Sequence, residues 1–363
     1  MKKILVILLT FLLLCGCVKS NKEDIVGKFK EKVEKTNSYI LKGTMTIASN
    51  EDTFTYSVTA SKSKDDYYKV SLINKTNDHE QVILKNSDGV YVVTPELNKS
   101  FKFQSDWPYN GSQSYLLDVL VNDIDNDTEV HTETRDKTNI IQCKVNYPNN
   151  ATLYSEKIYL DKDYGVNKVE VLDQDGNVKI TLTVSSVNYK PSFDNDYFSL
   201  ESLITETENS TTNNEEQSKE TKENNESINN SENETENNET TENTSNILED
   251  IIYPLYIPAN TSLSSQDTIE TDNGNRAILT FSGEKPFILV EEMSKKYDYL
   301  EVIPINGDPL MLAETVGALS ANSLYWTSDG VDYYISSTSL DTNELMTIAE
   351  SLTGTSIIVS SEK

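Results

Sequence analysis

A single 46-residue stretch, residues 201–246, sets the limits on how this chain of 363 residues can fold. It contains no Gly, Pro or aromatic residue, consists almost wholly of Glu, Asn, Thr and Ser, and carries 13 Glu against Lys219 and Lys222. Such a segment cannot bury enough apolar surface to offset the entropy lost on ordering, so we expect a disordered linker. Because the length suits two ordinary domains, we predict one over residues 23–200 and a second over residues 247–363.

The N-terminus has the pattern of an export signal. After Met-Lys-Lys comes an apolar run over residues 4–14, which is too short to cross the roughly 30 Å hydrocarbon core of a bilayer as a stable helix. We therefore predict a signal peptide over residues 1–16. The alternative is an ordinary signal peptide without lipid attachment, or an uncleaved anchor.

A lipid-attachment motif closes this signal. Leu14, Cys15, Gly16 and Cys17 stand in the order of the bacterial lipobox, in which the peptidase cuts before a cysteine that carries diacylglycerol. Several acyl chains make attachment effectively permanent. We predict lipidation at Cys17, a tether over residues 17–22, and a place on the extracytoplasmic face of the cell membrane.

Charge and cysteine content exclude several functions. The net charge is −28, whereas a nucleic-acid binder needs Lys/Arg patches that displace counterions, so we expect no nucleic-acid partner. The predicted second domain has 18 acids against 5 bases, which also disfavours contact with anionic lipid. Removing the signal leaves Cys143 as the single free thiol, which rules out an internal disulfide and nearly excludes a Cys/His metal site.

The first domain alternates apolar and polar residues over most of its length. An apolar stripe at helical spacing over residues 25–33 predicts a first helix, and residues 115–124 predict a short second one. Period-two stretches between and after them predict strands, with hairpin turns at Asp88-Gly89 and Asp175-Gly176. We therefore expect a mainly β (α+β) fold in which one strongly curved antiparallel sheet wraps around helices.

The second domain is predicted to be a small α+β unit. A Pro-interrupted segment over residues 251–258 is expected to form an edge strand, and a turn at Asp329-Gly330 joins a hairpin. Asp341 and Glu344 have the spacing of a capping box, which predicts a terminal helix that stops at Gly354. Strands are expected over residues 277–281, 287–291, 300–305, 315–319, 324–326 and 331–336.

The first domain resembles the LolA/LolB-like lipoproteins, and more closely the sporulation lipoproteins of endospore-forming bacteria. The resemblance rests on residues 90–108 (VYVVTPELNKSFKFQSDWP), on residues 113–116 (QSYL), on the lipobox and on the hairpin over 162–171. It implies a half-barrel closed by helices around an apolar cavity, which in the carrier proteins receives acyl chains. The lipidated cysteine departs from a carrier, because a tethered protein cannot shuttle between membranes.

Residues 300–352 resemble a small uncharacterised module that recurs in lipoproteins and anti-sigma factors of the same organisms. The residues that carry this shorter resemblance are Trp326, Gly330, Tyr333-Tyr334 and the stretch 349–352. It implies a second contact domain and does not specify an activity.

The sequence gives little support for an enzymatic function. His79 and His131 lie in polar surroundings typical of surface residues, and Cys143 alternates with Ile141 and Val145 as a buried apolar residue would. Asp123, Asp125 and Asp127 alternate as Ca²⁺ ligands sometimes do, but no Gly or terminal Glu follows at EF-hand spacing. The sequence contains neither a Gly-x-Ser-x-Gly elbow nor a phosphate loop. We therefore predict no catalytic residue, no metal site and no cofactor.

One aromatic cluster is the candidate binding surface. Phe101, Phe103, Trp107 and Tyr109 are either ordinary core packing or the lip and lining of the half-barrel cavity, where Trp and Tyr offer a polar edge to a ligand headgroup. The sequence leaves both interpretations open.

These patterns together predict a membrane-anchored, non-catalytic lipoprotein of a Gram-positive cell envelope. Its first domain would bind an apolar ligand, such as a lipid acyl chain, or a protein partner in envelope or spore assembly, during sporulation or germination. The alternative is an extracytoplasmic sensor that couples lipid or lipoprotein binding to an anti-sigma factor. A third possibility, an envelope hydrolase, requires an acid/base pair that the sequence does not reveal.

Overall fold

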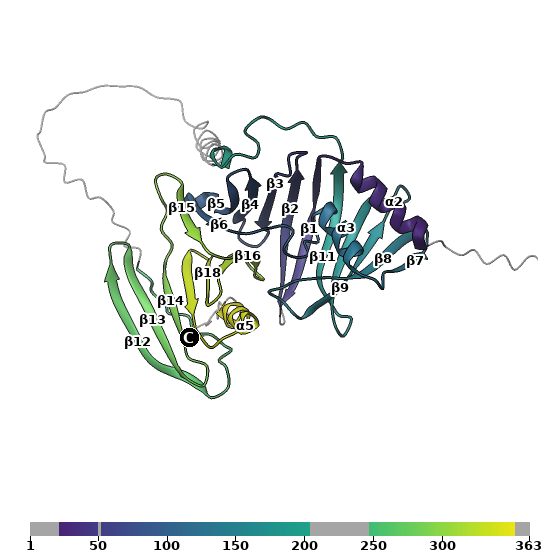
Figure 1. Cartoon of the computed structure of the whole chain (residues 1–363). Helices are drawn as coiled ribbons and strands as arrows, with labels where there is room; N and C mark the ends of the chain where they lie inside the picture. The colour runs from purple at the N-terminus through teal and green to yellow at the C-terminus, as the bar shows by residue number, and fades with distance from the viewer. Residues whose placement is uncertain (1–21, 50–51, 204–246, 353–363) are drawn as a thin grey trace, which may run out of the picture.

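The computed structural model describes residues 22–49, 52–203 and 247–352. We call residues 22–203 the first unit and residues 247–352 the second unit. The lipobox, nearly all of the predicted linker and the predicted helix stop at Gly354 lie outside the described residues. Strands dominate both units, as expected (Figure 1).

The first unit is built on one long, open, curved sheet. Its strands run antiparallel from β6 through β1 to β7, and β1 pairs with both β2 and β11. The elements are α2 (Lys22–Glu34), β1 (Tyr39–Ser49), β2 (Asp52–Lys62), β3 (Tyr68–Asn74), β4 (Glu80–Asn86), β5 (Gly89–Thr94), η1 (Pro95–Leu97), β6 (Lys99–Phe103), α3 (Leu117–Asn126), β7 (His131–Arg135), β8 (Thr138–Lys144), β9 (Leu153–Leu160), β10 (Val166–Asp173) and β11 (Val178–Asn188).

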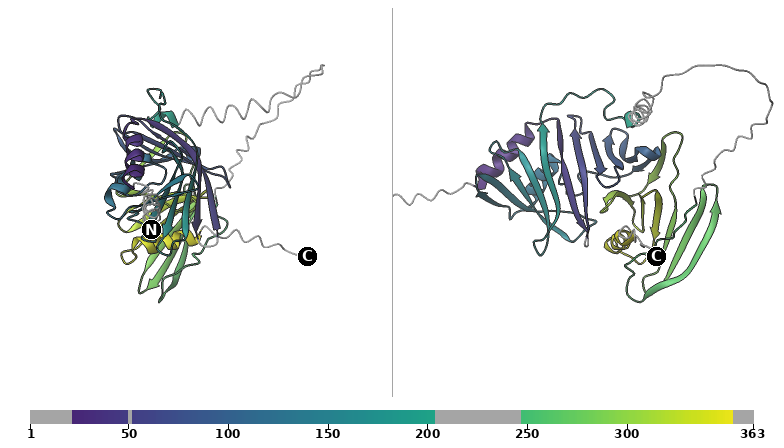
Figure 2. Two further views of the ribbon diagram at one scale, coloured as in Figure 1. Left: turned by 90° about the vertical axis from the view of Figure 1, so that its right-hand side faces the viewer. Right: turned by 180° about the vertical axis from the view of Figure 1, so that it is seen from behind.

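Helices α2 and α3 lie together on the inner face of this sheet (Figure 2). Ile25, Phe29 and Val33 repeat at helical spacing and are buried, so α2 presents an apolar stripe to the sheet. Leu41 and Met45 of β1 are buried on the same core, as period-two alternation requires. The expected half-barrel wrapped on helices is therefore confirmed.

The second unit has a seven-stranded sheet in the order β12-β13-β14-β19-β18-β17-β16, with a helix packed beside it. The predicted capping box is present, because Asp341 Oδ1 accepts the Glu344 N–H at 3.0 Å and Glu344 Oε2 accepts the Asp341 N–H at 3.2 Å. The elements are β12 (Thr261–Thr271), β13 (Gly274–Gly283), β14 (Phe287–Met293), β15 (Glu301–Ile305), β16 (Asp308–Met311), β17 (Val316–Leu319), β18 (Ser323–Ser328), β19 (Val331–Ser336) and α5 (Thr342–Leu352).

One prediction for the second unit is wrong. Residues 251–258 form no strand, and the edge strand is β12, which follows them. Pro254 and Pro258 lack the N–H that a ladder needs, whereas residues 261–271 contain no Pro and pair along their length with β13. Because β12 is mostly polar, its sequence lacks the apolar alternation that predicts a strand.

The two units share a sheet. Strand β15 of the second unit pairs in parallel with β6 of the first, with Glu301 opposite Lys99 and Ile305 opposite Phe103. Before this strand, the Tyr297 N–H donates to the Leu97 carbonyl at 3.0 Å. The second unit thus extends the half-barrel sheet by one strand and closes one end of its core.

Candidate functional site

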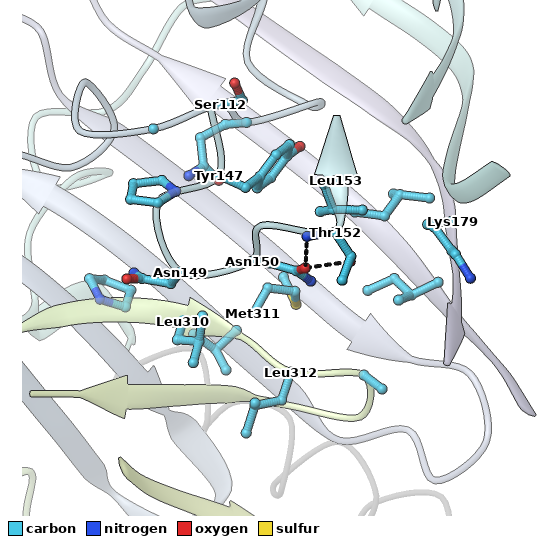
Figure 3. A pocket seen from close by; sticks show the side chains of 18 of the residues that line it. Ser112, Tyr147, Asn149, Asn150, Thr152, Leu153, Lys179, Leu310, Met311 and Leu312 are labelled. Carbon is cyan, nitrogen blue, oxygen red and sulfur yellow. Dashed lines mark hydrogen bonds between the residues drawn. The ribbon is translucent and has the colours of Figure 1, made fainter. Parts of the chain in front are cut away.

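A cavity of about 280 Å³ lies where the second unit meets the open end of the half-barrel (Figure 3). One wall comes from the first unit, through β1, the loop after Trp107, the β8–β9 loop and β11. The other wall comes from the second unit, through residues 309–313 and Val316, with Glu350 of α5 at the edge. Neither unit alone would enclose this space.

The inner part of the cavity is apolar. Trp107, Leu153 and Ile180 of the first unit are buried and line it. Leu310 and Leu312, also buried, line it from the second unit, where Leu310 lies on the short strand β16 and Leu312 directly follows it. Apolar side chains from both sides give the cavity a lining suited to the hydrocarbon part of a ligand.

The rim is polar and structured. Asn150 Oδ1 accepts the Thr152 N–H at 3.2 Å and the Thr152 hydroxyl at 2.6 Å, which fixes the turn between β8 and β9. Lys179 of β11 also lines the cavity and supplies a cation, and its Nζ lies 3.6 Å from Asp173 Oδ2. The volume lies just below the range of about 300–1,000 Å³ typical of small-molecule sites.

A carboxyl group stands at the junction of the rim and α5. Ser49 donates its hydroxyl to Glu350 Oε2 at 3.3 Å, which joins the end of β1 to the second unit. Burial raises the pKa of Glu350, although the Ser49 hydrogen bond partly opposes the shift. A cation and a titratable acid therefore face the same opening.

Buried and half-buried polar contacts hold the two walls together. Gln81 of β4 binds both backbone groups of Val316: its Oε1 accepts the Val316 N–H at 2.5 Å and its Nε2 donates to the Val316 carbonyl at 3.2 Å. The Tyr56 hydroxyl donates to the Ala313 carbonyl at 2.7 Å. These bonds fix the backbone that presents the second wall.

A buried ion pair lies at the same interface. Lys99 Nζ of β6 is 2.7 Å from Asp332 Oδ2 of β19, and the two side chains are 2% and 9% exposed. Burial lowers the pKa of Lys99. Burial alone would raise the pKa of Asp332, but attraction to Lys99 and hydrogen bonds from Ser294 and Thr327 outweigh it, so this pKa is lowered.

The four aromatic residues singled out from the sequence do not share one place. Trp107 is buried and lines the cavity. Phe101 and Phe103 are buried outside the cavity lining, and the Phe101 ring meets Tyr325 of the second unit edge-on with centroids 4.9 Å apart. Tyr109 is 49% exposed and bonds through its hydroxyl to Tyr68. Trp107 thus lines the cavity, Phe101 and Phe103 pack in the core, and Tyr109 lies at the surface.

The candidate catalytic groups are poorly placed for chemistry. His79 and His131 lie at the surface, and His79 Nε2 is 3.8 Å from Glu96 Oε2. Cys143 is buried beside Ile141, as the alternation predicts, and burial raises the pKa of its thiol. A buried thiol with a raised pKa is a weak nucleophile.

Sequence reasoning missed a pair of buried carboxyl groups, Asp123 on α3 and Glu156 on β9. Ser112 donates to Asp123 Oδ1 at 2.9 Å, and the other oxygen of each carboxyl group has no hydrogen-bond partner. Burial raises the pKa of Asp123 to about 7 and raises that of Glu156 well above its usual range. Glu156 is fully buried, so a substrate cannot reach both carboxyl groups.

The aspartate alternation does not build a cation site in the structure. Helix α3 turns Asp123 into the core, and Asp125 pairs with Lys30. Across residues 22–49, 52–203 and 247–352, no cluster of three or more His, Cys, Asp or Glu has the arrangement of a metal site. Within the same residues, the helices are too short or too polar to cross a bilayer.

Comparison with known proteins places the chain among sporulation proteins. A family model described as "Sporulation protein YdcC-like" matches residues 1–198. The chain is 35% identical over 350 residues to "Sporulation protein YdcC" of Bacillus subtilis (strain 168), a match that covers 96% of this chain and 95% of that protein.

The solved structures that match are less similar to this chain than the Bacillus subtilis protein is. The complex of MucA and MucB from Pseudomonas aeruginosa matches at 11% identity with a TM-score of 0.31, covering 88% of this chain and 95% of that one. A putative outer membrane lipoprotein-sorting domain from Vibrio parahaemolyticus matches at 14% identity with a TM-score of 0.32, covering 50% of this chain and 97% of that one.

Proposed function

Because the chain belongs to the sporulation protein YdcC-like family, we propose that it is a membrane-tethered, non-catalytic binding protein of the envelope of sporulating cells. Cys17 attaches it to the extracytoplasmic face of the cell membrane, including the membranes between mother cell and forespore. The second unit stays docked on the first unit while the protein holds its ligand.

One observation carries the proposed binding role: the cavity between the units has an apolar interior and a polar rim. This division suits an amphiphile whose short hydrocarbon segment lies against Trp107 and Leu310 while its head stays near Lys179. The volume of about 280 Å³ fits part of an acyl chain rather than several complete chains. Lys179 favours an anionic head, since it is the cation that lines the cavity within the described residues.

A cavity-blocking substitution tests this role. Thr152 is exposed at the rim, so Thr152→Trp places a large ring over the opening without removing core contacts. The matched control is Val178→Trp, because Val178 is exposed and neighbours Lys179 on β11 but is not among the residues that line the cavity. Binding of decanoate and of lysophosphatidylglycerol is measured by titration calorimetry on the full chain in mild detergent.

The proposal expects the rim variant to bind at least about tenfold more weakly, a loss of roughly 1.4 kcal/mol. The control variant should bind as the unmodified chain does. Equal weakening in both variants, or no binding of either probe to the unmodified chain, would refute an amphiphile site in this cavity.

A second candidate function, sensing, is favoured by the origin of the cavity walls. A ligand there touches both units, so its binding can favour or oppose their docking. Hydrogen exchange of the β6–β15 amides, measured with and without lysophosphatidylglycerol, tests it. Sensing requires a change in their protection, whereas simple storage of a ligand leaves them unchanged.

A further inference from the structure

The two sheets end in four edge strands, and three of them are protected in the usual ways. An edge strand exposes unpaired N–H and C=O groups, which proteins shield by short length, Pro or charged side chains. Strand β7 has five residues, among them Glu133 and Arg135. Strand β15 has five residues with Pro304, and β16 has four with Pro309.

Strand β12 breaks this pattern. It has eleven residues, nine of them exposed, and contains no Pro, Lys or Arg. Its single irregularity is a register shift between Leu263 and Ser265. Among the described residues, no strand pairs with its outer edge, and it lies on the side of the second unit farthest from the first (Figures 1 and 2). A long edge that has no Pro, Lys or Arg, and whose two charged residues are both acidic, is a template for another strand.

Exposed apolar side chains lie on β12 and in the segment just before it. Eleven of the fourteen large hydrophobic residues that are exposed in the described parts of the chain belong to the second unit. The segment before β12 contributes the most exposed one, Leu255 at 75%, and the Tyr253 hydroxyl bonds to Gln266 of β12. On β12 and just before it, the exposed apolar residues are Tyr253, Leu255, Tyr256, Ile257, Leu263 and Ile269.

The charge around β12 selects the kind of partner. Residues 247–275 contain five acids and no Lys, Arg or His. Two of these acids, Asp267 and Glu270, lie on β12 itself. A second copy of the chain would bring the same acidic edge against itself, and an anionic lipid surface would be repelled. The complementary surface is therefore a basic one.

We propose that β12 is a docking edge for an extended segment of a protein partner that carries Lys or Arg between β-branched or aromatic residues. Backbone hydrogen bonds extend the second unit's sheet by one strand and supply affinity. Basic side chains of the partner pair with Asp267 and Glu270, and its apolar residues cover Leu263 or Ile269. This surface lies apart from the ligand cavity, so either can be present without the other.

Hydrogen exchange on the full chain in mild detergent tests the proposal. The probe is a library of peptides of about ten residues that alternate Lys or Arg with Val, Thr or Tyr. We expect at least one peptide to slow exchange of the β12 amides by roughly tenfold or more at tens of micromolar. The effect should weaken in high salt, and N-methylation of alternate peptide residues should abolish it.

Charge reversal distinguishes this docking role from non-specific binding of peptides. In the double variant Asp267→Lys/Glu270→Lys, the peptide effect should be lost, while Glu133→Lys on the protected edge β7 should leave it intact. The proposal is overturned if no peptide protects β12 or if the double variant binds equally well. It is also overturned if β12 becomes protected by self-association or by vesicles of phosphatidylcholine and phosphatidylglycerol without peptide, because the occupant is then a second copy or a membrane.

Discussion

Replacing Lys99 with Met tests how the two units are held together. The substitution keeps most of the side-chain volume but leaves the Asp332 carboxylate buried without its cation. Breaking a buried ion pair from one side costs about 3–5 kcal/mol, or a factor between about 10² and several 10³ in the unfolding constant. The loss should be smaller at pH 5 than at pH 8, because Asp332 without Lys99 has a raised pKa and takes up a proton as the pH falls.

Urea unfolding followed by tryptophan fluorescence measures this loss, since Trp107 reports on the first unit and Trp326 on the second. The double variant Lys99→Met/Asp332→Leu should recover most of the stability, because an apolar pair replaces the charges. Lys144→Met is the control: Lys144 pairs with Glu129 at the surface at 2.9 Å, and its loss should cost less than about 1 kcal/mol. If Lys99→Met costs as little as the control, or if the double variant is as unstable as the sum of the single variants, the buried ion pair does not hold the two units together.

Three further predictions concern other parts of the chain. Burial raises the pKa of Asp123 to about 7, so between about pH 4 and 7 the native Asp123 holds a proton that the unfolded chain releases, and stability falls as the pH rises. Urea unfolding at pH 5 and 8 covers about two pH units of this window, so Asp123→Asn should remove up to about 3 kcal/mol of the fall. An equal fall in both proteins would contradict this prediction. Asp341→Ala should cost about 1 kcal/mol in thermal unfolding by removing the bond to the Glu344 N–H, and an unchanged Tm would count against a working cap. Cys17→Ser should abolish labelling of the protein with radioactive palmitate, whereas Cys15→Ser should leave the labelling unchanged; palmitate labelling that persists in Cys17→Ser would exclude lipid attachment at this residue.

Local signals in the sequence were sufficient where one short segment determines the structure. The capping pair Asp341 and Glu344 lies within one helical turn, so its spacing alone predicts the contact. The hairpin turn at Asp329-Gly330 is similar, because both residues adopt the positive φ angles that this pair tolerates, 47° and 76°. The alternation that buries Cys143 beside Ile141 likewise needs only neighbouring residues.

The features that could not be predicted from the sequence depend on contacts between segments far apart in the chain. Strand β12 buries almost nothing, so it lacks the apolar alternation by which a strand is recognised. The cavity forms where residues near Leu310 meet residues near Leu153, and no spacing in the sequence links them. A weak signal did exist for the buried acids: Asp123 follows Leu120 by three residues, on the apolar face of its helix, and Glu156 alternates with Ile158 on its strand.

Native mass spectrometry of the full chain, isolated from sporulating cells of its own organism in mild detergent, shows whether the cavity holds a ligand. We expect a co-purifying amphiphile that stays bound to the unmodified chain and to Val178→Trp and is missing from Thr152→Trp. A clean mass for the unmodified chain, with no uptake of added decanoate or lysophosphatidylglycerol at tens of micromolar, would contradict a ligand-binding cavity between the two units.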